Sequence, residues 1–125
     1  MGPFREYNQI EISRRDARSL GVNPPVRRSG DLADSLEITL VTEKNSINVK
    51  GLIIANRHIH MTSDDAEKYG VEDKQKVQIR IPGDKSGIMD AEVKISDTGY
   101  FELHIDTDDA NAFLIEDNDK VTMIV

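Results

Sequence analysis

Cysteine and tryptophan are absent from the 125 residues, and only three phenylalanines and three tyrosines are present. Without thiolates the chain cannot form disulfides, iron–sulfur sites or cysteine-ligated zinc sites, so imidazole and carboxylate are the metal ligands that it offers. Because aromatic residues are few, a core must be built mainly from Ile, Val and Leu, which favours strands. The length fits one ordinary domain or two very small ones.

Basic residues are outnumbered, 16 against 23 acidic residues, which gives a formal net charge of −7. Proteins that bind nucleic acid or anionic membranes broadly are expected to carry a basic face, so this charge argues against both partners. No run approaches the roughly 20 apolar residues of a membrane helix, and the first residues lack the apolar core of a secretory signal. We therefore expect a soluble intracellular chain.

Alternation of apolar and polar residues predicts a series of short strands separated by turns. The expected strands cover residues 10–12, 36–41, 47–54, 76–81, 91–95, 100–105 and 120–125. Two short helices are expected after the hydroxyl caps Ser13 and Thr62, ending at Gly21 and Gly70, and a third over 107–112.

The first two of these helices resemble each other in sequence. Each has Asp-Ala three residues after its cap and Gly-Val four residues after the alanine, and the caps Ser13 and Thr62 are 49 positions apart. A weak internal repeat is the simplest interpretation, and it suggests two related small barrels. Short capped helices are common, so coincidence is the alternative.

Two arginines follow the proline pair Pro24-Pro25, which excludes regular structure at that point. A guanidinium of Arg27 or Arg28, held in a stiff loop, could bind a pair of anionic oxygens. Ordinary loop charge is the alternative interpretation.

Two of the three histidines, His58 and His60, are separated by one residue at the end of a predicted strand. Alternation along a strand projects both imidazoles from the same face. Such a pair is a common way to hold a first-row metal ion, and it also occurs as ordinary surface decoration.

The third histidine, His104, lies in another predicted strand. Leu103 and Ile105 share one face of that strand, and Glu102, His104 and Asp106 share the other. Three imidazoles with an open coordination position form a known catalytic zinc site, and such a site requires the histidines to be concentrated in this way. A histidine on a solvated face is the alternative.

Other charged residues give weaker signals. On chemistry alone, Arg5 is a solvated terminal charge and Glu11 is the outward residue of a strand. The acidic residues Asp106, Asp108 and Asp109 lack the glycine and terminal glutamate of an EF-hand, so helix N-terminal charge explains them better. The sequence has no P-loop, dinucleotide fingerprint or Gly-x-Ser-x-Gly motif.

Several blocks together resemble one family, the PduL-type phosphotransacylases, also called phosphate propanoyltransferases. These enzymes move an acyl group between coenzyme A and inorganic phosphate. The matching blocks, in the family's order, are residues 2–5, 9–17, 24–31, 55–61 and 104–112. The Arg-His-Ile-His-Met block that begins at Arg57 is the most specific.

The resemblance implies two β-barrels with two zinc ions in the cleft between them. His58, His60 and His104 are similar to the trio that binds one zinc. Glu11 is similar to a carboxylate ligand of the second zinc, and Arg5 to the guanidinium that holds phosphate. The implied activity is zinc-dependent transfer of a short acyl group, with acyl-CoA and phosphate as small-molecule substrates.

The departure from the family lies at the N-terminus, where an upstream Val-Ser-x-Arg-His-x-His block that completes the second zinc site is missing. The expected fold is therefore mainly β, with two small related β-barrels and short capped helices, truncated at its start. Residues 1–54 would form the second half of the first barrel and residues 55–125 the second barrel, which carries the His-x-His motif. Exposed sheet edges would favour a homo-oligomer or a complementing chain.

A non-catalytic zinc-binding β-barrel module, acting as a partner subunit, is the alternative function. No motif marks the residues that contact coenzyme A or set the preferred acyl chain. The cytoplasm and the lumen of a bacterial microcompartment are both open as locations.

Overall fold

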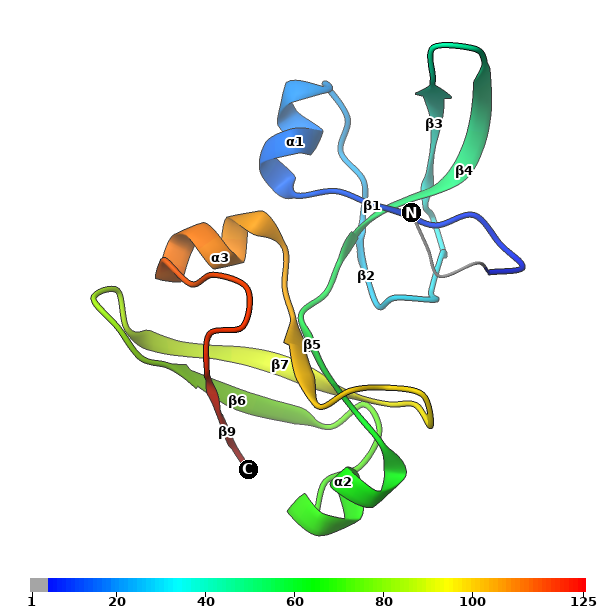
Figure 1. Cartoon of the computed structure of the whole chain (residues 1–125). Helices are drawn as coiled ribbons and strands as arrows, with labels where there is room; N and C mark the ends of the chain where they lie inside the picture. The colour runs from blue at the N-terminus through cyan, green and yellow to red at the C-terminus, as the bar shows by residue number, and fades with distance from the viewer. Residues whose placement is uncertain (1–4) are drawn as a thin grey trace. The chain divides into compact units, whose positions relative to one another are not determined.

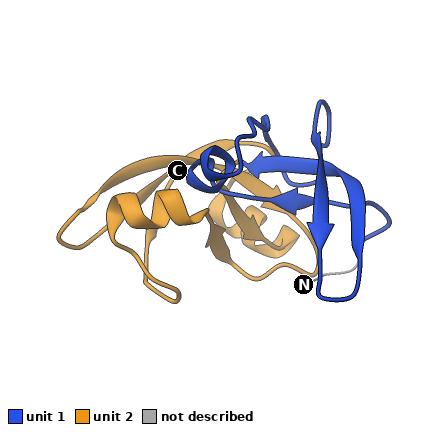
Figure 2. Ribbon diagram, turned by 90° about the horizontal axis from the view of Figure 1, so that it is seen from above, with its two compact units in different colours: residues 1–55 blue, residues 56–125 orange. Residues whose placement is uncertain are grey.

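The computed structural model describes residues 5–125, and the fold is mainly β, as predicted (Figure 1). Two compact units divide the chain, Met1–Ala55 and Asn56–Val125 (Figure 2). The elements of the described residues are β1 (Ile10–Glu11), α1 (Arg14–Ser19), β2 (Val26–Arg27), β3 (Leu36–Val41), β4 (Ser46–Ala55), β5 (His58–Met61), α2 (Ser63–Tyr69), β6 (Lys76–Ile81), β7 (Gly87–Ile95), β8 (Glu102–His104), α3 (Thr107–Phe113) and β9 (Thr122–Ile124). Within residues 5–125, no helix has the length and apolar character needed to cross a membrane.

The long strand β4 organises the first unit. It forms the predicted antiparallel hairpin with β3, and it pairs in parallel with β1 and β2. A small apolar core lies along this strand and α1, and its buried members are Ala17, Val49, Leu52, Ile53 and Ile54.

A close backbone approach fixes one position of β4. A Cβ added at Gly51 would collide with the carbonyl oxygen of Asn8, and the φ of Gly51 is +138°. Only glycine combines this backbone conformation with the absence of a side chain. The segment before β1 can therefore lie directly against β4.

The expectation that regular structure is excluded after the proline pair is wrong at β2. Val26 pairs in parallel with Ile54, and Arg27 with Ala55. The prolines themselves stay outside this ladder, and the carbonyl oxygen of Pro25 accepts a hydrogen bond from the amide of Ile54 at 3.0 Å. A proline lacks an N–H but keeps its acceptor, so it can lead into a short strand.

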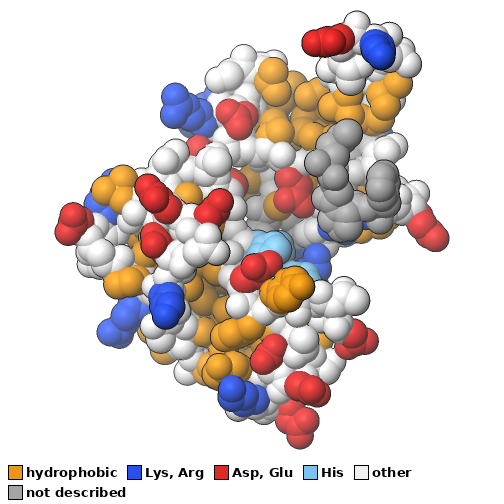
Figure 3. Space-filling model, in the orientation of Figure 1, with side chains coloured by type: hydrophobic (Ala, Val, Ile, Leu, Met, Phe, Trp, Pro, Cys, Tyr) orange, Lys and Arg blue, Asp and Glu red, His pale blue; other side chains and the backbone are white. Residues whose placement is uncertain are grey.

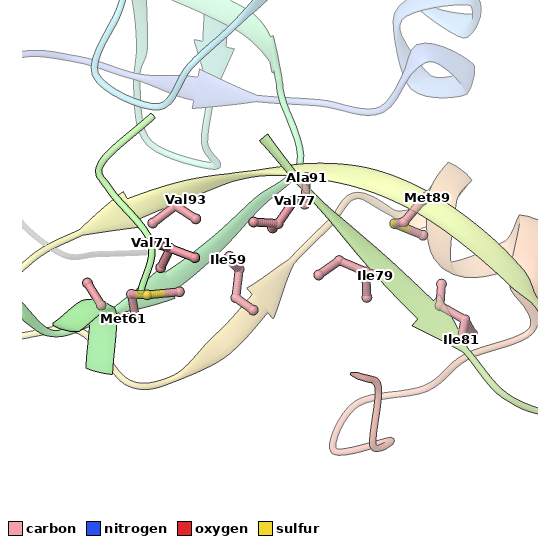
Figure 4. Packing of buried hydrophobic residues seen from close by; sticks show 10 residues of the cluster. Ile59, Met61, Val71, Val77, Ile79, Ile81, Met89, Ala91 and Val93 are labelled. Atoms are coloured by element: carbon pink, nitrogen blue, oxygen red, sulfur yellow. The ribbon is translucent and has the colours of Figure 1, made fainter. Parts of the chain in front are cut away.

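A five-stranded sheet in the order β8-β5-β7-β6-β9 forms the second unit and curls as half of a barrel. Its core has the alternation predicted from sequence, since every second residue of β6 is buried. The clustered core side chains, most of them labelled in Figure 4, are Ile59, Met61, Ala66, Val71, Val77, Ile79, Ile81, Met89, Ala91 and Val93.

The prediction that the histidine pair lies at the end of the preceding strand is wrong. β4 ends at Ala55, and β5 is a separate strand that pairs with β7 and β8 in the second unit. Ile59 and Met61 explain the separation, because both are buried in the core of that unit.

The two strand-plus-helix segments are alike in detail. The hydroxyl of Ser13 accepts a hydrogen bond from the third residue of α1, and that of Thr62 does the same in α2. Left-handed glycines follow both helices, Gly21 at φ +70° and Gly70 at φ +65°. In each segment the amide after the glycine donates to the carbonyl oxygen of the buried alanine at 3.0 Å. Each helix also follows a strand that is paired in parallel, β1 with β4 and β5 with β7.

Candidate functional site

Alternation along β5 separates its side chains into two sets. Ile59 and Met61 are buried, and His58 and His60 are half-buried on the opposite face. Histidine side chains are visible at the molecular surface in Figure 3, where they are pale blue. The predicted common face of the two imidazoles is therefore confirmed.

Strand β8 brings the third histidine to this face. His104 pairs with His58 in the antiparallel ladder, and Glu102 pairs with His60. The ring centroids are separated by 4.8 Å for His58 and His104, 5.3 Å for His60 and His104, and 5.9 Å for His58 and His60. All three histidines of the sequence thus form one cluster.

Hydrogen bonds engage two of the ring nitrogens. The Nδ1 atom of His58 lies 3.1 Å from the carbonyl oxygen of Asn56, which directs its Nε2 away from the backbone. The Nε2 atom of His104 lies 2.9 Å from Oε1 of Glu102. Across the described residues 5–125, no three His, Asp or Glu side chains already form a group that could hold a metal ion.

Burial lowers the pKa of His58 below its ordinary value of 6.5, and the positive charges of His104, Lys94 and His60 add to this effect. The carbonyl of Asn56 acts in the opposite direction. The pKa of His60 is lowered as well, first by burial and then by Lys94, its partner in the parallel ladder with β7. Both imidazoles are consequently biased toward the neutral form, which is the one that ligates metal ions.

Gly99 packs against the cluster. A Cβ added there would overlap the imidazole of His60 at Nδ1. The absence of a side chain at this position allows the loop before β8 to lie on the ring of His60, a contact that was not predicted from the sequence.

Arg57, directly before His58, is a further residue of this region, and no motif in the sequence indicates its contact. Its Nε atom donates to Oδ2 of Asp109 in α3 at 2.9 Å. Burial raises the pKa of Asp109 above its ordinary value of 3.8, and the guanidinium of Arg57 opposes that shift. Asp106, expected at a helix N-terminus, is the N-cap of α3 and accepts from the amide of Asp109 at 2.9 Å rather than sharing a face with His104.

The remaining candidates, Arg5 and Glu11, lie in the unit Met1–Ala55. Arg5 is exposed, and its Nη1 donates to the hydroxyl of Tyr7 at 2.9 Å. Glu11 is exposed and accepts a hydrogen bond from the side-chain amide of Gln9.

Gln9 ties Glu11 to the loop after β2. Its Nε2 donates to Oγ of Ser29 at 3.1 Å, and its Oε1 accepts from the amide of Gly30 at 2.8 Å. Gln9, which directly precedes β1, is a contact residue of Glu11 that no motif in the sequence indicates.

Arg27 is used within its own loop. Its guanidinium donates to the carbonyl oxygens of Ala33 at 2.8 Å and Val26 at 2.9 Å, and it pairs with Asp34 at 3.1 Å. These contacts favour the loop interpretation of Arg27 over an anion clamp.

A family model described as phosphate propanoyltransferase matches residues 1–116. The chain belongs to the phosphate propanoyltransferase family. The matched range includes all five residues predicted from sequence to form the site, Arg5, Glu11, His58, His60 and His104.

Individual phosphate propanoyltransferases are similar to the chain at 38–48% identity. The chain is 47% identical to that of Listeria monocytogenes over 108 residues, which are 85% of this chain and 51% of the relative. It is 48% identical to that of Priestia megaterium over 100 residues, which are 78% of this chain and 46% of the relative. It is 44% identical to that of Thermotoga maritima over 109 residues, which are 85% of this chain and 52% of the relative. The chain therefore spans about half the length of these relatives.

Proposed function

We propose that the protein containing this chain is a phosphate acyltransferase that moves a short acyl group between coenzyme A and inorganic phosphate. In the forward direction, a phosphate oxygen attacks the thioester carbonyl carbon, a carbon–oxygen bond forms, and the carbon–sulfur bond breaks to release coenzyme A as the thiolate. The family membership supports this reaction, and the cluster of His58, His60 and His104 within the matched range is the observation that carries it.

The chemistry of the three imidazoles and the separation of their ring centroids support a zinc ion, although their side chains would have to turn to bring three nitrogen atoms to one point. Three imidazoles on one tetrahedral zinc, with Zn–N bonds of about 2.0–2.1 Å, have ring centroids about 5 Å apart. The three centroid separations are 4.8–5.9 Å. Binding would require His104 to exchange the hydrogen bond from Nε2 to Glu102 for a metal bond, or to ligate through Nδ1. When bound, the zinc ion would supply Lewis-acid stabilisation of negative charge.

Arg5 and Glu11 would bind charged groups, phosphate and a metal ion respectively. We propose that Arg5 binds phosphate through its planar guanidinium, which matches a pair of anionic oxygens, and that its hydrogen bond to Tyr7 helps to orient it. We propose that Glu11, held by Gln9, is a carboxylate ligand of a second zinc ion. We also propose that the chain assembles with further copies of itself or with a complementing chain. Its proposed location is the cytoplasm or the lumen of a bacterial microcompartment.

Release of coenzyme A from propanoyl-CoA, measured with and without phosphate, tests the reaction. We expect phosphate-dependent release from a full-length protein that carries these residues, and loss of that release when His58→Ala and His60→Ala are combined. The 125 residues alone are expected to be weakly active or inactive. Zinc binding by a full-length protein that shows no phosphate-dependent release would instead favour the non-catalytic module.

The role of Arg5 has its own test in the same full-length protein. A bidentate contact between guanidinium and phosphate is worth roughly 1.5–3 kcal/mol, so Arg5→Lys should weaken apparent phosphate affinity or turnover about tenfold or more. Lysine keeps the positive charge but lacks the planar pair of N–H donors of the guanidinium. Zinc content and melting temperature should therefore stay near the parent values. Arg14→Lys, an exposed change on α1, is the matched control. Parental phosphate kinetics for Arg5→Lys would contradict the proposed role.

A further inference from the structure

The ion pair between Arg57 and Asp109 joins segments that are 52 residues apart in sequence. The Nε–Oδ2 distance is 2.9 Å, and the two side chains are 40% and 21% exposed. Arg57 directly precedes β5, and Asp109 lies in the first turn of α3, whose N-cap follows His104 by two residues. The pair therefore connects the start of one histidine-bearing strand to the helix that follows the other.

The direct pairing between these two strands is short. It consists of three residue pairs, from His58 with His104 to His60 with Glu102. Strand β8 is also at the edge of the sheet, so it is held by a neighbouring strand on one side only. The β6–β7 ladder, by comparison, has six residue pairs. The position of His104 relative to the other two imidazoles must therefore depend on contacts beyond the β5–β8 ladder.

Both ends of the ion pair are anchored by backbone hydrogen bonds. The carbonyl oxygen of Arg57 accepts from the amide of Glu92 in β7 at 3.1 Å. The amide of Asp109 donates to the capping carboxylate of Asp106 at 2.9 Å. The side-chain contact therefore links a residue held by β7 to the capped first turn of α3, which directly follows β8.

We propose that Arg57 is a positioning residue, which acts through Asp109 to hold His104 at the separation from His58 and His60 that one shared metal ion requires. The inference rests on the proposed function, in that these three histidines bind zinc. Residues that hydrogen-bond directly to the ligands of a metal site commonly alter metal affinity 10–100-fold when they are replaced, and Arg57 acts one step further out, so its effect should lie at the low end of that range.

Zinc affinity of the 125-residue chain, measured by competition with a chromophoric chelator, tests this role. Arg57→Gln should weaken zinc binding about tenfold. The matched control is Arg27→Gln, which removes an arginine–aspartate pair of 3.1 Å in the other unit and should leave zinc affinity at the parent value. Parental zinc affinity in Arg57→Gln would overturn the inference. Absence of zinc binding by the parent would overturn the zinc site of the proposed function, and the inference with it.

A measurement without metal separates positioning from general stabilisation. In zinc-free Arg57→Gln, backbone amides of the β5–β8 ladder should exchange with solvent faster than in the parent, while the β6–β7 ladder keeps its parental protection. Equal acceleration in both ladders would indicate a role in overall stability and would overturn the inference. If Arg57→Gln fails to fold, Asp109→Asn removes the same ion pair from its other end, with the same expected results.

Discussion

The neutral imidazole is favoured at His58 and His60, because burial and the nearby charge of Lys94 lower both pKa values. In the metal-free chain, NMR titration of the imidazole protons should give midpoints below 6.5 for both residues. Between those midpoints and pH 6.5 the unfolded chain binds more protons than the folded chain, so the free energy of unfolding should fall as the pH is lowered through this range. Lys94→Gln should move both midpoints upward, and midpoints at or above 6.5 in the parent would contradict the prediction.

Gly99 controls the position of one imidazole. Because an added Cβ overlaps the ring of His60, Gly99→Ala should force that ring to move and should weaken zinc binding. The NMR signals of His60 should shift more than those of His58, and the melting temperature should change little because a side chain can yield more easily than backbone. Unchanged His60 signals in Gly99→Ala would show that the loop yields instead of the ring.

Alternation in the sequence was sufficient to predict that His58 and His60 share a face, and that prediction is confirmed. The contacts of Arg57 and Gly99 were not predictable in the same way. Each depends on the approach of a segment about 40 or 50 residues away, and neither residue type indicates such a contact by itself. The metal-binding roles of the three histidines stay predictions.

The close contact between β4 and the segment before β1 makes a second glycine sensitive to substitution. Gly51→Ala places a methyl group against the carbonyl oxygen of Asn8 and also strains the backbone, so we expect a loss of at least about 1–3 kcal/mol in the free energy of unfolding. Urea denaturation measures the loss. Gly21→Ala is the control, because Gly21 has φ +70° but no atom within 4 Å of an added Cβ. Equal losses in the two variants would show that the contact with Asn8 contributes nothing.

Elements with a clear period of two were predicted close to their observed bounds, such as β3 and β6. The two-residue strand β2 was not predicted, because two residues are too few to show an alternating pattern. Its pairing with β4 joins residues that are 28 positions apart in sequence. β8 is shorter than the predicted strand over 100–105 because Asp106 caps α3 and so ends the extended segment. β5 was not predicted as a separate strand, because nothing in the sequence shows that the apolar run before it belongs to a different unit.

Metal content is a property of the whole chain. Protein purified without chelators should contain close to one zinc ion per chain, because three histidines can complete one site and no others are present for Glu11 to share. His58→Ala combined with His60→Ala should abolish zinc binding, as measured by elemental analysis. Glu11→Gln should leave the zinc content at the parent value. Unchanged zinc in the double histidine variant would contradict the site.

The two similar segments of strand and capped helix have a consequence for substitution. In each segment, side chains two positions apart leave the same face of the strand, and the helix after it is fixed by its own caps and glycine. One segment presents Gln9 and Glu11, and the other, 49 positions later, presents His58 and His60. The side chains that each segment displays are thus independent of the caps and the glycine that fix its helix, so substitutions at these four positions should leave both helices intact.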